Sequence, residues 1–242
     1  MADQTVESSP QVYARVGGGL YLIIIITGLL SEIFVRGKLV VPDDVLVTAH
    51  NIATSQLLWR IGIVCDLIAH VCDVPLILIL YLLLRPVNKP LALLAVFFTL
   101  TQTAVLVATK LNLFAPLLLL GNAEYLKAFE PRQLDALMYL AIRLDSLGFG
   151  VGLIFFGFAC IVLGYLIYRS IYLPRALGIL LQIAGLCYLT NSFALILAPA
   201  FAGVIFPGIL LPAFVAESSL CLWLLVKGLN VQLWKERALS SV

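Results

Sequence analysis

Long runs of apolar residues, separated by shorter polar segments, dominate the pattern along this chain of 242 residues. A helix needs about 20 predominantly apolar residues to cross the hydrocarbon core of a bilayer. Runs of that length occupy about residues 16–35, 57–84, 91–112, 142–168, 174–198 and 204–226. The pattern predicts an all-α, polytopic transmembrane helix bundle with six spans. Near Pro116, the chain either extends the third helix or turns along the membrane surface.

The basic residues near the span ends are distributed unequally between the two sides of the predicted membrane. One side holds Arg15, Arg85, Lys89, Arg169, Arg175, Lys227, Lys235 and Arg237. The other side holds Arg36, Lys38, Lys127 and Arg132, which lie in longer loops. Because short cytoplasmic loops are enriched in lysine and arginine, the first side is predicted to be cytoplasmic, together with both termini. Residues 1–15 and 229–242 are then cytoplasmic tails, and residues 16–228 form one transmembrane domain.

The first outer loop contains a predicted surface helix at about residues 42–56. Pro42, Asp43 and Asp44 resemble a helix start, and apolar residues follow at helical spacing. Such a segment is typical of an amphipathic helix at the membrane surface. Trp59 follows near the outer boundary, where an interfacial aromatic residue is expected.

Composition supports a membrane protein and excludes several other classes. Hydrophobic residues make up 62% of the chain and charged residues 12%, against about 25% charged residues in soluble domains. The net charge of +2 is too small to indicate nucleic-acid binding, and no nucleic-acid partner is expected. The five cysteines lie in apolar runs without a CxxC pair, which argues against a disulfide framework.

Glycines recur at short intervals in the fourth and fifth spans. They are Gly148, Gly150, Gly152, Gly157 and Gly164 in the fourth span, and Gly178 and Gly185 in the fifth. Small residues at such spacing allow helix backbones to approach closely. We expect these faces to pack the two spans as an antiparallel hairpin within one chain, with a dimer interface as the alternative.

The second span carries the densest set of ionisable residues at membrane depth: Asp66, His70 and Asp73. At about 100° per residue, Asp66 and His70 differ by about 40° around the helix, and Asp66 and Asp73 by about 20°. The three side chains are therefore predicted to share one face. Ionisable residues inside a membrane are costly and usually paired or functional.

Other polar groups are candidates for the same site. They are Glu217, Asp145, Asn191 and Arg60, with Glu32, Lys110, Asn112 and Arg143 near the outer ends of spans. Most lie at mid-depth or farther out, which predicts a polar cavity that opens to the outside and is closed to the cytoplasm. Snorkelling to the interface would be sufficient to explain Glu32, Lys110 and Arg143.

The residues alone leave three interpretations of the second-span face open. It forms a proton relay or ion site, it holds a metal, or it provides buried hydrogen bonds that fix helix packing. Sequence motifs of soluble enzymes, such as a P-loop, GxGxxG, GxSxG or HExxH, are absent.

Three segments carry a resemblance to a known family. They read HNIATSQLLWRIGIVCDL, LYLLLRPVNKPLA and, from Phe155, FFGFACIVLGYLIYRSIYLPRALGILLQIAGLCYLTNSFALILAP. The chain resembles the DUF4386 family of bacterial integral membrane proteins from about residue 14 to residue 228. The resemblance implies a multi-span protein of the bacterial inner membrane and no established activity.

The sequence therefore supports three hypotheses. The first is a non-enzymatic membrane protein, without a metal or cofactor, whose polar interior binds or moves a small solute, ion or proton. The second is an intramembrane metal-dependent lipid hydrolase with Asp66, His70 and Glu217 as ligands or acid/base groups. The third is a structural or regulatory subunit that packs against another copy or another membrane protein. Membrane lipid is the expected partner in every case.

Overall fold

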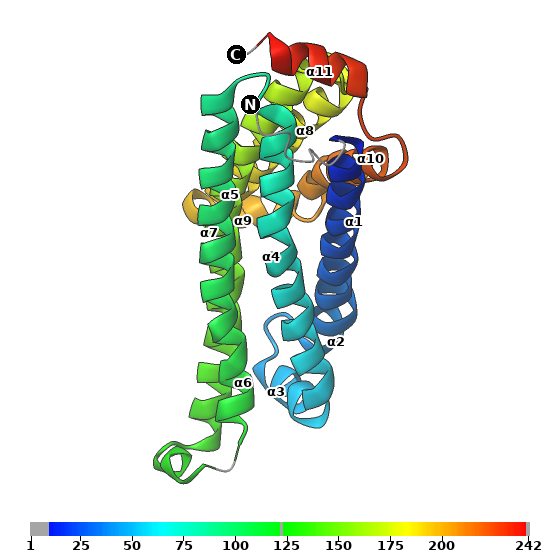
Figure 1. Ribbon diagram of the computed structural model, residues 1–242. Coiled ribbons are helices and arrows are strands. Elements are labelled where there is room, and N and C mark those ends of the chain that lie inside the picture. The colour runs from blue at the N-terminus through cyan, green and yellow to red at the C-terminus, as the bar shows by residue number, and fades with distance from the viewer. Residues whose placement is uncertain (1–9, 122, 241–242) are drawn as a thin grey trace.

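The computed structural model describes residues 10–121 and 123–240, and these residues form helices without any strand. Figure 1 shows an elongated bundle of long helices. The start of α1 (Pro10–Leu29) and the helix α11 (Val231–Leu239) lie at the same end of the bundle. We call this end the terminal face, and we call the opposite end, which carries α3 (Val45–Thr54), the distal face.

Six helical segments among the described residues are long and apolar enough to cross a membrane. They are Pro10–Leu39, Gln56–Leu84, Lys89–Leu119, Pro131–Arg169, Arg175–Leu197 and Gly208–Val226. The predicted fold class is therefore confirmed. The first, third and fourth spans are longer than predicted. The first and third continue through segments that are not regular α-helix, and the fourth begins earlier.

Two spans continue beyond the predicted ends through segments that are not α-helical. After α1, a π-helix η1 (Leu30–Arg36) leads into the short α2 (Gly37–Leu39). After α5 (Lys89–Thr109), a 3₁₀-helix η2 (Lys110–Phe114) leads into α6 (Ala115–Leu119). Of the two alternatives at Pro116, the structure has the extended helix.

The fourth span is the long helix α7 (Pro131–Arg169), which begins well before the predicted residue 142. Glu130 and Gln133 form a capping box at its start, and Pro131 occupies its first turn. Its 39 residues correspond to about 58 Å of helix, against about 30 Å of hydrocarbon. This helix is therefore longer than a bilayer requires, and its first turns lie at the distal face, beside η3 (Glu124–Ala128).

At the distal face, α3 occupies the segment for which a surface helix was predicted. The Asp44 side chain caps it by accepting a hydrogen bond from the Val47 amide at 3.0 Å. Ile52 of α3 is buried and belongs to the same cluster as Trp59 of α4 (Gln56–Leu84). The Trp59 side chain is packed inside the bundle and not on its surface: it is 2% exposed, and its Nε1 donates to the Leu113 carbonyl at 2.8 Å.

The fifth span, α8 (Arg175–Leu197), packs against α7 through the predicted glycine faces. A Cβ atom added to Gly164 would lie 2.6 Å from the carbonyl oxygen of Gly178, and one added to Gly185 would lie 2.5 Å from that of Gly157. The other glycines of α7 meet different helices. Gly148 and Gly152 face α5, at Thr109 and Leu106, and Gly150 faces Leu195 of α8.

The chain returns to the terminal face after α8. It passes through α9 (Pro199–Ile205), the 3₁₀ turn η4 (Gly208–Leu210) and α10 (Leu211–Val226). The predicted C-terminal tail instead forms α11, and residues 10–15 of the predicted N-terminal tail belong to α1. Residues 1–9 and 241–242 of the predicted tails lie outside the described residues.

The close approach of α7 and α8 yields a stability prediction. In Gly178→Ala, the new methyl group would meet the Gly164 carbonyl at 2.5 Å and the Tyr168 amide nitrogen at 2.6 Å. We expect a loss of about 1–3 kcal/mol, because backbone atoms must move apart. Thermal unfolding in detergent, followed by circular dichroism, measures it. Gly19→Ala is the control, because nothing lies within 4 Å of its added Cβ; equal melting temperatures for the two variants would contradict the packing argument.

Candidate intramembrane polar site

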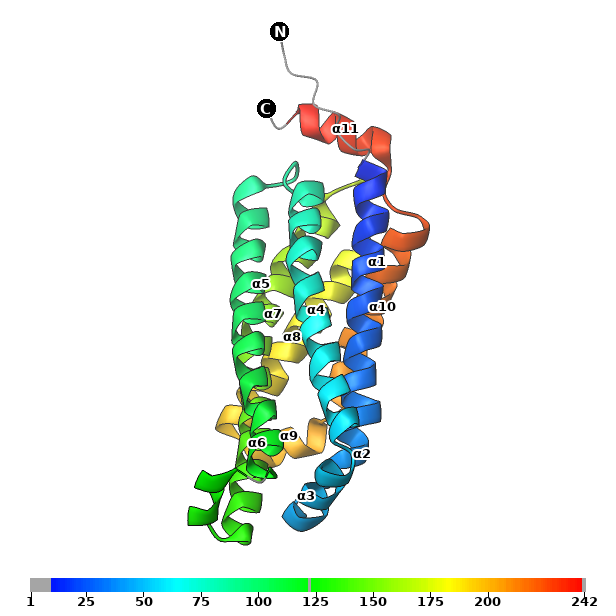
Figure 2. The same cartoon turned by 60° about the horizontal axis from the view of Figure 1, so that its bottom comes forward.

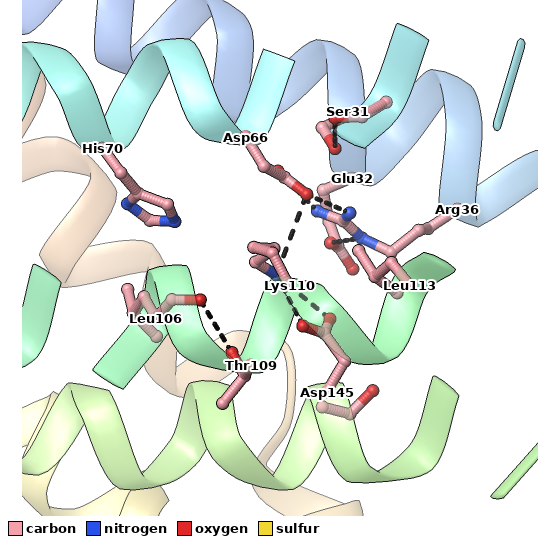
Figure 3. A network of polar contacts seen from close by, with 12 residues as sticks. Ser31, Glu32, Arg36, Asp66, His70, Leu106, Thr109, Lys110, Leu113 and Asp145 are labelled. Atoms are coloured by element: carbon pink, nitrogen blue, oxygen red, sulfur yellow. Dashed lines mark hydrogen bonds and ion pairs between the residues drawn. The ribbon is translucent and has the colours of Figure 1, made fainter. Parts of the chain in front are cut away.

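Asp66 of α4 is paired with Arg36, a residue that the sequence analysis assigned to the outer loop. The Arg36 guanidinium binds both carboxylate oxygens, with Nη1 at 2.7 Å from Oδ2 and Nη2 at 3.1 Å from Oδ1 (Figure 3). Its Nε donates to Glu32 at 2.6 Å, one helical turn earlier. Because η1 continues the first span beyond its predicted end, Arg36 is still in a helix when it reaches Asp66.

Lys110 of η2 provides a second cation to the same cluster. Its Nζ lies 2.9 and 3.0 Å from the two carboxylate oxygens of Asp145 and 3.7 Å from Asp66 Oδ2. The Lys110 side chain is 4% exposed. The snorkelling explanation for Lys110 is therefore wrong, since the amine points inward to two carboxylates (Figure 3).

We call Arg36, Asp66, Lys110 and Asp145 the distal ion cluster. Its members come from η1, α4, η2 and α7, so it joins four segments of the bundle. Two formal positive charges face two negative charges, which offsets part of the cost of burying each one. Nearby, the Ser31 hydroxyl donates to the Gly62 carbonyl at 3.0 Å. The residues of the distal ion cluster thus pair with one another and do not line the open cavity that the sequence predicts.

Glu217 of α10 lies in a different environment, nearer the middle of the bundle. The Tyr188 hydroxyl of α8 donates a hydrogen bond to Glu217 Oε1. The buried Tyr21 hydroxyl of α1 is a second hydrogen-bonding group for this carboxyl, and Asp73 is close enough to act on it electrostatically. Glu217 therefore has hydroxyl and carboxyl neighbours but no cation among the described residues that act on it.

A cavity of about 50 Å³ lies beside Glu217. The residues that line it come from all six spanning segments: Tyr21, Ile24, Asp73, Leu76, Ile77, Leu80, Thr99, Phe156, Cys160, Leu163, Leu181, Glu217 and Leu220. The Thr99 hydroxyl is buried and has no hydrogen-bond partner among the described residues. We call Glu217, Asp73, Tyr21 and Thr99, with this cavity, the central carboxylate site.

His70 connects to this site through Asp73. Its Nδ1 lies 3.4 Å from Asp73 Oδ2, one helical turn along α4. The three residues of the predicted second-span face thus divide between two groups. Asp66 joins the distal ion cluster, whereas Asp73 lines the central cavity with His70 beside it.

Two residues predicted for the polar site lie outside both groups. The Arg60 side chain is exposed, and it forms no ion pair among the described residues. Asn191 is buried in α8 but does not line the cavity. The proposed ligand set of the hydrolase hypothesis is also not assembled, since no three His, Cys, Asp or Glu side chains of the described residues are placed to hold one metal ion.

Three partners of these carboxylates were missed from the sequence: Arg36, Tyr188 and Tyr21. Lys110 was a candidate for the site, but its pairing with Asp145 was not predicted. Glu32 and Arg36, four residues apart, were a signal that the first helix continues. Tyr188 and Tyr21 lie 29 and 196 positions from Glu217, and tyrosine is common in spans, so no local pattern connects them to it.

Comparisons with known proteins agree with the observed architecture. The model of a family described as "Domain of unknown function (DUF4386)" matches residues 16–228. A protein from Archaeoglobus fulgidus, described as uncharacterised, is 29% identical over 158 residues, which are 65% of this chain and 78% of that protein. No solved structure matches the chain. The resemblance found in the sequence is therefore confirmed.

The distal ion cluster yields a prediction for Lys110→Met. The substitution keeps the length of the side chain but leaves Asp145 buried without its cation, so we expect a loss of about 3–5 kcal/mol in stability. Adding Asp145→Asn should recover part of this loss, because it removes the unpaired charge. Thermal unfolding in detergent measures all variants.

The control for this experiment is Lys127→Met. Lys127 also contacts a carboxylate, Glu124, at 2.7 Å, but the two side chains are 71% and 85% exposed. Exposed pairs contribute about 0–1 kcal/mol. If Lys110→Met and Lys127→Met melt at the same temperature, the distal cluster does not stabilise the bundle as its geometry indicates.

Proposed function

The chain belongs to the DUF4386 family of multi-pass helical membrane proteins, and we propose that it binds and transfers a proton through Glu217 and Asp73. The observation that carries this proposal is the central carboxylate site, where two carboxylates border one cavity at membrane depth without a cation. Carboxylates inside a membrane are typical of proton and ion pathways. The convergence of all six spanning segments supports a role for this cavity in the whole bundle.

The size of the cavity favours a proton carried by water over an organic solute. Pockets for small-molecule ligands have volumes of about 300–1,000 Å³, whereas this cavity has about 50 Å³. A site for one water needs about 10–15 Å³ on a comparable measure. The space therefore suits a few water molecules beside Glu217 and Asp73.

The chemistry of the lining indicates the charge of the occupant. The polar atoms come from two carboxyl groups, two hydroxyl groups and the Cys160 thiol, and none of the described lining residues is cationic. Such a lining disfavours an anion. The unpartnered Thr99 hydroxyl and the Tyr21 hydroxyl can bond to a water that connects the two carboxyl groups.

His70 supports a route to this site from the distal side. The α4 helix begins at the distal face, so His70 lies one turn on the distal side of Asp73. An imidazole has one nitrogen that can donate a proton and one that can accept it, which makes His70 a suitable proton donor to Asp73. We propose the order His70, Asp73, Glu217 for protons that enter from the distal side.

We also propose a bacterial cytoplasmic membrane as the location, with the terminal face toward the cytoplasm. The basis is the excess of lysine and arginine in the short loops and helix ends of that face. In this orientation, the distal ion cluster occupies the outer half of the bundle. The central carboxylate site then lies between this cluster and the cytoplasmic end.

The test of the proposed function is proton uptake into liposomes that contain the purified full chain. A potassium diffusion potential drives uptake, and a pH-sensitive dye inside the vesicles reports it. We expect Glu217→Gln to reduce uptake to the leak of protein-free vesicles, because the amide cannot take up and release the proton. Asp73→Asn should have the same effect.

The matched control is Glu32→Gln, another carboxyl group on a spanning segment. Its side chain is 67% exposed and does not line the cavity, so uptake should equal that of the unmodified chain. Uptake by Glu217→Gln at the unmodified rate would refute the proposed site. A current that follows a sodium gradient and is insensitive to a pH gradient would replace the proton with sodium as the transported cation.

A further inference from the structure

The terminal face contains a groove that is distinct from the central carboxylate site. It has a volume of about 770 Å³ and lies between the α4–α5 turn and α11. The residues that line it are Arg85, Pro86, Val87, Asn88, Lys89, Pro90, Trp234, Lys235, Ala238 and Leu239. In Figure 1, α11 crosses the end of the bundle near the tops of α4 and α5.

All charged residues that line the groove are basic. Arg85, Lys89 and Lys235 contribute cationic groups, and no acidic residue lines the groove. All three side chains are exposed, and none of them forms an ion pair among the described residues. Three uncompensated cations around one hollow are complementary to an anion.

The wall formed by α11 is fixed to the rest of the bundle. The buried Trp234 Nε1 and the Tyr172 hydroxyl both donate to the carbonyl oxygen of Leu83, at 2.9 and 2.7 Å. Burial raises the pKa of Tyr172, so its hydroxyl remains a donor. The Asn230 amide, just before α11, donates to the Tyr172 carbonyl at 3.2 Å.

A second attachment holds the connection between α10 and α11. The Gln11 side chain of α1 donates to the Lys227 carbonyl at 2.9 Å and accepts from the Leu229 amide at 3.0 Å. Gly228 between them has a positive φ of 69°, which a glycine adopts without strain. The groove is thus a built feature of the fold, because hydrogen bonds hold its α11 wall against the end of α4 and against α1.

The position and rim of the groove indicate an amphiphilic occupant. The groove begins where α4 ends at Leu84 and where α5 begins at Lys89, the depth at which spans meet lipid headgroups. Its rim includes the apolar side chains of Val87 and Leu239, and Leu239 is 79% exposed. A free anion would leave this apolar rim exposed to water, whereas the glycerol and acyl region of a lipid would cover it.

We propose that this groove binds the headgroup phosphate of an anionic phospholipid. Arg85 can hold phosphate oxygens in a fork of two hydrogen bonds, and Lys89 and Lys235 add point charges from the two walls. Basic pockets at the ends of spanning helices on the cytoplasmic side are suited to such headgroups. The α11 helix therefore provides one half of a lipid site.

The test compares lipid binding by the delipidated full chain and by Arg85→Gln/Lys89→Gln/Lys235→Gln. Phosphatidylglycerol is added to each in detergent, and bound lipid is counted by native mass spectrometry. Each basic residue near a membrane surface contributes about five-fold in affinity. We therefore expect at least ten-fold weaker binding by the triple variant, while phosphatidylcholine binds equally weakly to both proteins.

The control variant, Lys38→Gln/Arg60→Gln/Arg132→Gln, removes the same charge from exposed residues of the distal half. It should bind phosphatidylglycerol like the unmodified chain, and circular dichroism should show the same helix content for all three proteins. Equal loss in both triple variants would reduce the effect to net charge and overturn the proposal. Displacement of the bound lipid by inorganic phosphate at equal concentration would overturn the lipid assignment in favour of a free phosphate.

Discussion

The pairing of the partly buried Arg36 and the buried Lys110 with the buried Asp66 and Asp145 constrains the distal half of the bundle. A charged side chain at the centre of a spanning helix costs about 2.5–3.5 kcal/mol on insertion scales. That cost is reduced when η1, α4, η2 and α7 meet, because each charge then faces an opposite one at 2.7–3.1 Å. Separating any of these segments would expose unpaired charges to hydrocarbon, so the pairing holds the distal half together.

The central carboxylate site contrasts with this cluster in its lack of a cation. Glu217 and Asp73 border the same cavity, and the groups around them are hydroxyls, a thiol and apolar side chains. Two neighbouring carboxylates at low dielectric need positive charge that the lining does not provide. Fixed pairs therefore compensate the distal carboxylates, whereas an exchangeable proton is the natural compensation for the central ones. This difference separates a structural group from a candidate transfer site.

The sequence predicted the six spans because apolar runs of sufficient length are a physical requirement of the bilayer. It misplaced Arg36 because a cation normally marks a span end, and only the approach of Asp66 offsets the cost of partly burying this one. The helical angle correctly grouped Asp66, His70 and Asp73 on one face. It did not show that Asp66 and Asp73 are separated by about 10 Å along the axis, which places them in different groups. Partners on distant helices, such as Tyr188, depend on packing that a single helix does not encode.

The charges of the two faces connect the orientation of the chain with its chemistry. Near the distal face, Arg36, Lys110 and Lys127 contact carboxylates, whereas the exposed Arg60 has no ion-pair partner among the described residues. At the terminal face, all three cations of the groove, Arg85, Lys89 and Lys235, have no ion-pair partner among these residues. Lysine and arginine side chains in a short loop favour its cytoplasmic location, and they attract the anionic lipids of that leaflet. The same residues can therefore account for both the predicted orientation and the proposed lipid site. Because Trp234 and Tyr172 fix α11 at the end of α4, the cations of the groove are held in place around the proposed headgroup phosphate.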